Sequence, residues 1–288
     1  ETMKSEMNRE LGKLLEKLTG KHFDLKNPDV TIVIDNNTNS IRVQFRGLYI
    51  LGKYQKLARG IPQTKWICRN CNGKGCTVCK GEGKLYKTSV QEIIEKPLLK
   101  AADSKESSLH AAGREDIDAR NLGWRPFVIE LVKPEKRKLD LKKLEIEVNK
   151  SKKVKVKGLK IVDDGRFWVK KLKTDRYEKT YAVDVEFEND VDRKLLKDVK
   201  KLVKATLMQR TPTRVVHRRA NIIRKRLVKA ISYTVVNKRR IKFKIRTEAG
   251  TYIKELVNGD DGRTQPNISQ IIGNKVKSLN LDVIKIHS

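Results

Sequence analysis

HAAGREDIDARNLG, residues 110–123, leads into the apolar run PFVIELV, residues 126–132. The first stretch gathers three acids, Glu115, Asp116 and Asp118, in a turn with a glycine near each end. Acids are the minority in this chain, because its 288 residues hold 66 Lys and Arg against 35 Asp and Glu, a formal charge of +31. An acidic turn in so basic a chain makes sense if one carboxylate does chemistry on a bound polyanion. The apolar run predicts a strand directly behind that turn.

The excess of positive charge indicates the kind of partner. It predicts attraction to polyanions and an affinity that falls as salt rises, so we expect a nucleic acid. RNA fits better than duplex DNA, because aromatic and arginine-rich segments suit flipped or unpaired bases and no helix resembles a major-groove reader. A solvated lysine-rich surface is the alternative. The sequence has no apolar run of about 18 residues and no visible signal peptide, so we expect no membrane span and a cytoplasmic protein.

Apolar periodicity predicts an α+β fold. Residues 3–18 have the spacing of an amphipathic helix, and 31–35 and 41–45 alternate like a hairpin, so residues 1–65 are expected to form a small α+β module. SVQE (89–92) is a capping box that opens another helix. Further helices are expected at 191–208 and after Gly250.

Strands are expected to dominate from about residue 124. Most of them alternate apolar and polar residues, which favours a central, mainly antiparallel or mixed sheet with one wet face. We expect these strands at 126–132, 143–148, 153–162, 166–172, 179–187 and 241–245.

All four cysteines lie in CRNCNGKGCTVCKGEGK, within the segment 66–84. Their C-x2-C-x4-C-x2-C spacing lets two turns offer four thiolates to one tetrahedral structural Zn²⁺ that takes no part in catalysis, and the ligands would be Cys68, Cys71, Cys76 and Cys79. The glycines of the segment permit positive φ and bring backbone N–H groups close to the sulfurs. A redox dithiol or a pair of disulfides is the alternative. The segment also resembles, briefly, the CxxCxGxG repeats of J-domain chaperones.

Three motifs in order resemble those of the pseudouridine synthases. GRED (113–116) is similar to their G-R-x-D turn, whose aspartate is catalytic and corresponds to Asp116. KTYAVDV (179–185) is similar to the strand that carries a tyrosine against the target base. TEAGTYIKEL (247–256) is similar to the third motif, G-x-Y-I-[RK]-x-L. Taken singly, these stretches are explained equally by a surface turn, a core tyrosine and the start of an amphipathic helix.

Further stretches narrow the resemblance to one branch of that family. They are RGIPQTKW (59–66), QRTPTRVVHRRA (209–220) and NGDDGRTQPNI (258–268). With the cysteine cluster, they resemble the archaeal form of the tRNA pseudouridine synthases that act on uridines 54 and 55 of the T arm. The resemblance implies a THUMP-like RNA-binding module at 1–65, the four-cysteine zinc cluster at 66–84 and a pseudouridine-synthase catalytic domain at 85–288.

The resemblance also implies roles for particular side chains. Asp116 would act as nucleophile or as base at the sugar, Lys254 would supply the opposite charge, and Tyr181 would offer a flat face and a hydroxyl to the base. The reaction needs no cofactor, and the target base must first be flipped out of the folded T arm. We expect a monomer that contacts RNA through Arg114, Arg210, Arg214, His217, Arg218, Arg219 and Tyr252.

Two other classes of protein remain open on the sequence. One is a non-catalytic zinc-containing RNA-binding protein or RNA chaperone, to which the charge and the cysteines point. The other is a metal-dependent nuclease that uses Glu115, Asp116 and Asp118. Mg²⁺ usually takes carboxylates from separate elements, and these three are adjacent in one turn.

Overall fold

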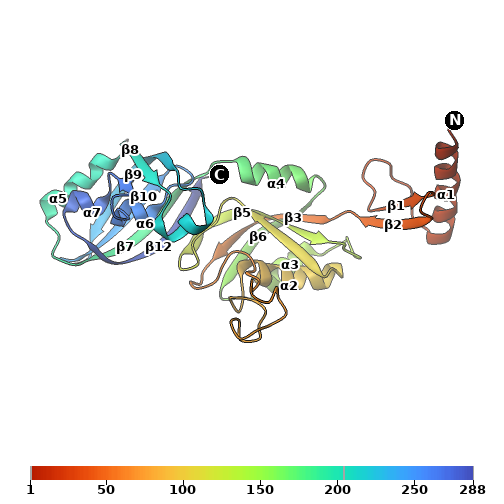
Figure 1. Ribbon diagram of the computed structural model, residues 1–288, viewed down its shortest axis with the longest axis horizontal. Coiled ribbons are helices and arrows are strands. Elements are labelled where there is room, and N and C mark those ends of the chain that lie inside the picture. Colours follow the sequence, from red (N-terminus) through yellow and green to blue (C-terminus); the bar gives the residue numbers. More distant parts are fainter. Residues whose placement is uncertain (1, 204, 288) are drawn as a thin grey trace.

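The computed structural model describes residues 2–203 and 205–287 and is elongated, with the N-terminal elements at one end (Figure 1). These elements are α1 (Met3–Thr19) and the hairpin of β1 (Val30–Asp35) and β2 (Ser40–Phe45). The predicted helix and hairpin are therefore confirmed. Helix α1 buries none of its residues, and most of the hairpin is exposed, so these elements build no core of their own.

One large sheet runs through the rest of the chain, in the order β11-β8-β9-β10-β7-β12-β5-β3-β6, with β4 paired to β5. All its strand pairs are antiparallel except β12 with β5, which is parallel. The predicted mainly antiparallel α+β fold is therefore confirmed. The strands are β3 (Leu48–Lys56), β4 (Glu106–Ala111), β5 (Arg120–Val132), β6 (Val154–Val162), β7 (Glu178–Phe187), β8 (Thr206–Arg210), β9 (Ile223–Val235), β10 (Arg240–Thr247), β11 (Thr264–Gln265) and β12 (Val276–His287).

Two hydrophobic cores flank the parallel β5–β12 pair. In one core, β3, β5 and β6 pack with α2 (Val90–Ala102) and α3 (Leu141–Val148). In the other, β7, β9, β10 and β12 pack with the helices of the C-terminal half, which are α5 (Arg193–Asp198), η1 (Val199–Leu202), α6 (Ile253–Asn258) and α7 (Ile268–Ile272). The acidic turn between β4 and β5 therefore lies at the seam between the two cores, beside the residues where β12 joins β5.

Three predicted elements are wrong. Residues 143–148, predicted as a strand, belong to α3, because Leu144 and Val148 are four apart and both buried while Asp140 caps the helix. Residues 166–172, also predicted as a strand, belong to α4 (Gly165–Thr174), which is capped by Asp164. The helix predicted at 191–208 ends with η1, and the segment then turns into β8.

The module predicted at 1–65 includes a strand that belongs elsewhere. β3 lies in this range, yet it pairs with β5 along one edge and β6 along the other, inside the large sheet. None of the described helices is long and apolar enough to cross a membrane.

Candidate active site

The acidic turn sends its neighbouring carboxylates in opposite directions. Gly113 has a φ of +75°, which lets the chain reverse at the end of β4. After this reversal, Glu115 is buried with 6% of its surface exposed, whereas the Asp116 side chain keeps 28%. The amide of Ala119 donates to the Asp116 carbonyl at 3.1 Å and closes the turn before β5 begins.

Beneath the turn lies a buried polar network around Glu115. The Arg125 guanidinium lies 3.1 Å from the Glu115 carboxylate, and the Tyr54 hydroxyl donates to the same group at 3.0 Å. Gln63 in turn donates to the Tyr54 oxygen at 2.7 Å and to the Gly113 carbonyl at 3.0 Å. Burial and the negative charge of Glu115 raise the pKa of Tyr54. This network joins β3, the segment after it and β5 to the underside of the turn.

Lys56, at the end of β3, holds the backbone of the turn. Its side chain is fully buried and donates to the carbonyls of Ile61, Asp116 and Ile117 at 2.9, 3.0 and 3.0 Å. No ion pair of Lys56 occurs in the part of the chain that the structure describes, and burial lowers its pKa to about 8. The lysine therefore fixes the peptide that carries the Asp116 side chain.

On the outer side, Asp116 lies between two cations. Arg214, in η2 (Thr213–Arg218), donates to Asp116 Oδ1 at 2.9 Å, and Lys254 Nζ lies 3.7 Å from Asp116 Oδ2. Lys254 contacts Asp118 more closely, at 2.6 Å. Burial alone would raise the pKa of Asp118, but the hydrogen bond and charge of Lys254 lower it. The predicted Lys254–Asp116 pairing is thus shared with Asp118.

Arg214 was expected to contact RNA, and the structure gives it a second partner inside the protein. Its Nε donates to the Glu255 carboxylate at 2.6 Å, and the Glu255 side chain is only 3% exposed. Burial opposes the charge on Arg214, but Glu255 and Asp116 together raise its pKa. The arginine is therefore fixed between one buried acid and the exposed Asp116.

Tyr181 lies in the sheet beside the turn. It pairs with Val283 of β12, which pairs in turn with Asn121 at the start of β5. Burial raises its pKa to about 12, with opposing effects from the positive charge of Arg125 and the negative charge of Asp116. Its hydroxyl has no hydrogen-bond partner among the described residues. The phenol is thus neutral near pH 7 and close to Asp116.

The remaining residues predicted to bind RNA fall into two groups. Arg114, Arg218, Arg219 and Tyr252 lie together: Arg219 donates to the Tyr252 hydroxyl at 3.2 Å, and burial and then repulsion from Arg218 and Arg219 lower the pKa of Arg114. The side chains of Arg210 and His217 are exposed and make no such contact within the described residues.

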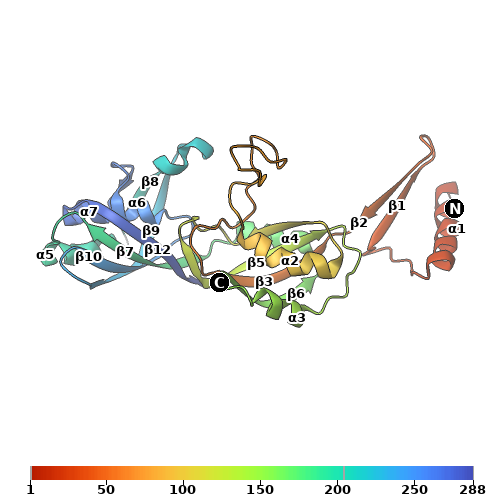
Figure 2. The ribbon, with the colours of Figure 1, turned by 90° about the horizontal axis from the view of Figure 1, so that it is seen from below.

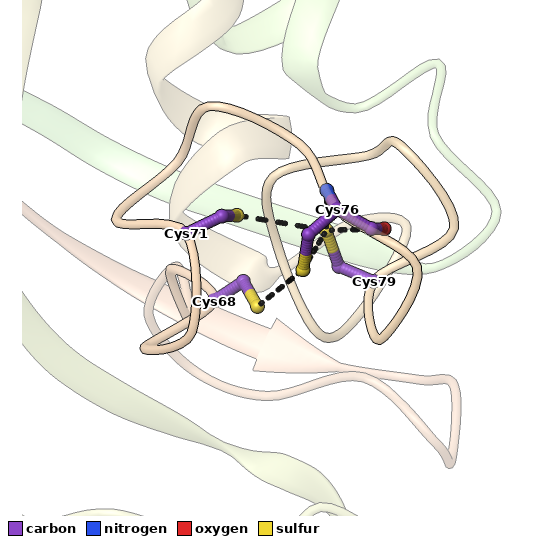
Figure 3. A group of neighbouring side chains, drawn as sticks. All are labelled: Cys68, Cys71, Cys76 and Cys79. Carbon is purple, nitrogen blue, oxygen red and sulfur yellow. Dashed lines mark hydrogen bonds between the residues drawn. The ribbon is translucent and has the colours of Figure 1, made fainter.

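The four cysteines converge as the spacing predicts (Figure 3). The sulfurs of Cys68 and Cys76 lie 3.8 Å apart, those of Cys71 and Cys79 3.8 Å, and those of Cys76 and Cys79 3.7 Å. Four sulfurs at about 2.3 Å from a central Zn²⁺ form a tetrahedron with edges of about 3.8 Å. The donor set and its spacing therefore fit a closed tetrahedral metal site.

Backbone geometry supports thiolates at this cluster. Gly75 and Gly83 have positive φ and donate their amides to the sulfurs of Cys71 and Cys79, each at 3.2 Å. A Cβ on Gly83 would overlap the Gly73 carbonyl oxygen, so only glycine fits there. A hydrogen bond from Asn70 contributes most to lowering the pKa of the Cys76 thiol, which falls to about 6. The predicted role of the glycines is confirmed.

Several residues of the site gave no recognisable signal in the sequence. Tyr54, Lys56, Arg125 and Glu255 surround the turn from three different elements, and their importance comes from burial and pairing. Gln63 lies inside the quoted RGIPQTKW stretch, so its segment, although not its role, was recognised.

Comparison with known proteins first identifies the class, the pseudouridine synthases. The family described as "Pus10, C-terminal" matches residues 49–287, and the one described as "Pus10 THUMP domain, archaeal" matches residues 1–35. The chain belongs to the Pus10 family.

The relatives named "tRNA pseudouridine synthase Pus10" include archaeal proteins that match nearly all of the chain. The one from Methanothrix thermoacetophila is 43% identical over 99% of this chain and 64% of its own length. The one from Archaeoglobus fulgidus is 41% identical over 99% of this chain and 79% of its own length. The chain therefore spans about two thirds of the first relative. Among solved structures, one titled "Crystal Structure of a Cbf5-Nop10-Gar1 Complex" aligns with a TM-score of 0.40 at 16% identity, covering 80% of this chain and 47% of that chain.

Proposed function

We propose that this chain isomerises uridine to pseudouridine in tRNA, at position 54, position 55 or both in the T arm, without a cofactor. Its relatives carry the name of that activity, and its motifs match the T-arm branch. The observation that carries the proposal is the position of Asp116, a partly exposed carboxylate on a turn held rigid from below and flanked by Lys254 and Arg214.

Asp116 is the residue that acts on the nucleotide, as nucleophile or as base at the sugar. An aspartate used in this way must stay ionised and oriented. Two neighbouring cations support the ionised form, and Arg214, itself tied to the buried Glu255, restricts the direction of the carboxylate. Glu115 takes no part in the chemistry, because it is buried against Arg125.

Tyr181 acts on the base after the glycosidic bond breaks. The uracil must then turn and rejoin the sugar through C5, whose proton must leave. A neutral phenol with a free hydroxyl beside Asp116 suits stacking on a flipped base and contact with that carbon. Lys254 holds Asp118 and Asp116 at the rim of the site, which supports an orienting role for Asp118.

The RNA is held by the basic segment that ends β8 and includes η2. Arg210, His217, Arg218 and Arg219 are exposed there, and Arg114 and Tyr252 face them from the acidic turn and the start of α6. Guanidinium groups without carboxylate partners suit phosphate contact and stacking on bases. The net charge of +31 strengthens attraction to any RNA.

The rest of the chain supports this activity. The cysteine cluster is proposed to hold a structural Zn²⁺, with four sulfur ligands and no open position for catalysis. The boundary between the THUMP-like module and the catalytic domain is proposed near residue 47, before β3 joins the large sheet. A cytoplasmic location and a monomeric state remain predictions.

The test is the pseudouridine content, at nucleotide resolution, of an unmodified tRNA transcript incubated with the protein and with Asp116→Asn. We expect pseudouridine in the T arm with wild type and none with the variant, while the binding of the transcript stays unchanged. Equal product from both proteins would exclude Asp116 as the catalytic residue. Binding without product from either protein would favour the RNA-binding or chaperone alternative.

The nuclease alternative is weakened by the turn itself. Of its three acids, Glu115 is buried against Arg125, so the carboxylates do not converge on one point. Intact RNA after incubation with Mg²⁺ is the result that we expect from the same experiment.

A further inference from the structure

Two segments far apart in the sequence meet beside the catalytic turn. The stem of the cysteine loop carries Trp66, and the C-terminal end of η2 carries Arg218, whose guanidinium carbon lies 5.9 Å from the centre of the Trp66 ring. Figure 2 shows the cysteine loop, between β3 and α2, and η2 rising from the same side of the sheet. The contact therefore joins the cysteine loop to the basic segment.

The stem holds a pair of aromatic rings in fixed geometry. Trp66 and Tyr86 lie edge to face, with centroids 5.5 Å apart and planes at 84°. A bridge between Ile67 and Lys84 and a hydrogen bond from the Leu85 amide to the Trp66 carbonyl at 2.9 Å hold the two strands of the stem together. Both rings remain partly exposed, although a ring with no further partner would gain by burial.

Positive charge gathers next to these rings without compensation. Arg114, Arg218 and Arg219 repel one another enough to help lower the pKa of Arg114, after the effect of burial. None of the three makes an ion pair with any residue that the structure describes. Three neighbouring guanidinium groups without carboxylates are complementary to phosphate.

The rings and the arginines together suit one kind of ligand. An indole faced by a guanidinium offers two flat surfaces to a nucleobase, and such stacking is available only to a base that is not paired within a duplex. The arginines beside them suit the phosphates that flank such a base. Arg219 also binds the Tyr252 hydroxyl, two residues before Lys254, so the surface is continuous with the reacting centre.

We propose that Trp66, Tyr86 and Arg218 form a stacking site for an unpaired nucleobase of the RNA substrate, distinct from the uridine that reacts, with Arg114 and Arg219 on its phosphates. This proposal rests on the proposed function, since it assumes that RNA enters the site beside Asp116. It gives the cysteine loop a role in recognition, because the loop carries the stem on which the rings stand.

The first test is the affinity of an unmodified tRNA transcript for Trp66→Ala, measured by fluorescence anisotropy at fixed salt. Loss of one stacked base should weaken binding about 5- to 150-fold, while the single-turnover rate at saturating protein stays unchanged. Trp66→Phe should restore most of the affinity. The matched control is Phe167→Ala, since Phe167 is also an exposed ring, 5.6 Å from Trp168 in an edge-to-face pair, but lies on α4, away from the cysteine loop in Figure 1.

A second variant guards against a loss that comes from misfolding of the stem. Arg218→Ala changes a different segment, should weaken binding as well, and should reduce the slope of log affinity against log salt by about 1. The double variant should lose less than the sum of the two single losses, because both residues hold the same base. Wild-type affinity in Trp66→Ala, or full additivity in the double variant, would overturn the proposal.

The outcome can be separated from a failure of the proposed function. If wild type makes pseudouridine and Trp66→Ala binds and reacts like it, only the stacking site is wrong. If no protein makes pseudouridine but affinity still depends on Trp66 and Arg218, the stacking site stands and the catalytic assignment fails.

Discussion

Glu115 and Asp116 are neighbours in sequence and of nearly identical chemistry, but they face opposite environments. The inner side of the turn is a dry network in which Arg125 and Tyr54 satisfy Glu115. The outer side is open, and Arg214 and Lys254 hold Asp116 at a surface that a nucleotide can reach. Burial, rather than residue type, therefore separates the acid that builds the site from the acid that we propose to react.

The largest expected effect is on stability, from Arg125→Met. This variant leaves Glu115 buried without its cation, which should lower the free energy of unfolding by about 3–5 kcal/mol. Urea unfolding followed by circular dichroism measures it. The control is Arg239→Met, whose exposed pair with Asp190 should leave the unfolding midpoint unchanged. Equal effects from the two variants would contradict the distinction between the inner network and ordinary surface pairs.

The inner side should also respond to alkaline pH through Lys179. Burial lowers its pKa to about 8, with repulsion from Arg125 adding to the shift and Glu115 opposing it. Since the unfolded chain binds this proton up to a pKa of about 10.4, the wild type should gain stability relative to Lys179→Met as pH rises from about 8 to 10.5, by up to about 3 kcal/mol. Urea unfolding of both proteins at pH 7.5 and pH 10 tests this. A difference independent of pH would show that the lysine is not charged and buried at neutral pH.

On the outer side, Arg214→Ala should lower the single-turnover rate about 10- to 100-fold, because the Asp116 carboxylate loses the group that orients it. Its effect on tRNA affinity should be smaller. The matched control is Arg210→Ala, which removes an exposed arginine of the same segment and should weaken binding without changing the rate at saturation. If both variants changed affinity alone, Arg214 would be an RNA contact and no part of the Asp116 arrangement.

The smallest effect on the turn is expected from removal of the metal. Chelation should speed hydrogen exchange at the amides of Gly75 and Gly83, which donate to cysteine sulfurs. The Ala119 amide, which closes the acidic turn, should exchange as before. Equal acceleration at all three amides would indicate that the cysteine cluster supports the turn as well as its own loop.

The sequence predicted the fold class because most strands alternate and the motifs occur in order. It failed at residues 143–148 and 166–172, where lysines and glutamates interspersed with apolar residues imitated strands. The caps Asp140 and Asp164 were the signals that pointed to helices there. It also missed β3 and β12, whose pairing with β5 joins segments that lie far apart along the chain.

The site was predicted unevenly for a related reason. Asp116, Tyr181 and Lys254 stand in local motifs, so a resemblance could identify them. The inner network could not be predicted, since Tyr54, Gln63 and Arg125 become partners only after β3 and β5 are paired. Arg214 was recognised as basic and exposed, but its contact with Glu255 depends on how η2 folds back over α6.

The most direct test of the two-sided turn compares Glu115→Gln with Asp116→Asn, measuring the free energy of unfolding and single-turnover pseudouridine formation for both. We predict that Asp116→Asn unfolds like wild type but loses at least about a thousandfold in rate. We predict that Glu115→Gln is less stable by about 1–3 kcal/mol and still forms pseudouridine at temperatures where it remains folded. A stable, inactive Glu115→Gln together with an active Asp116→Asn would contradict the account.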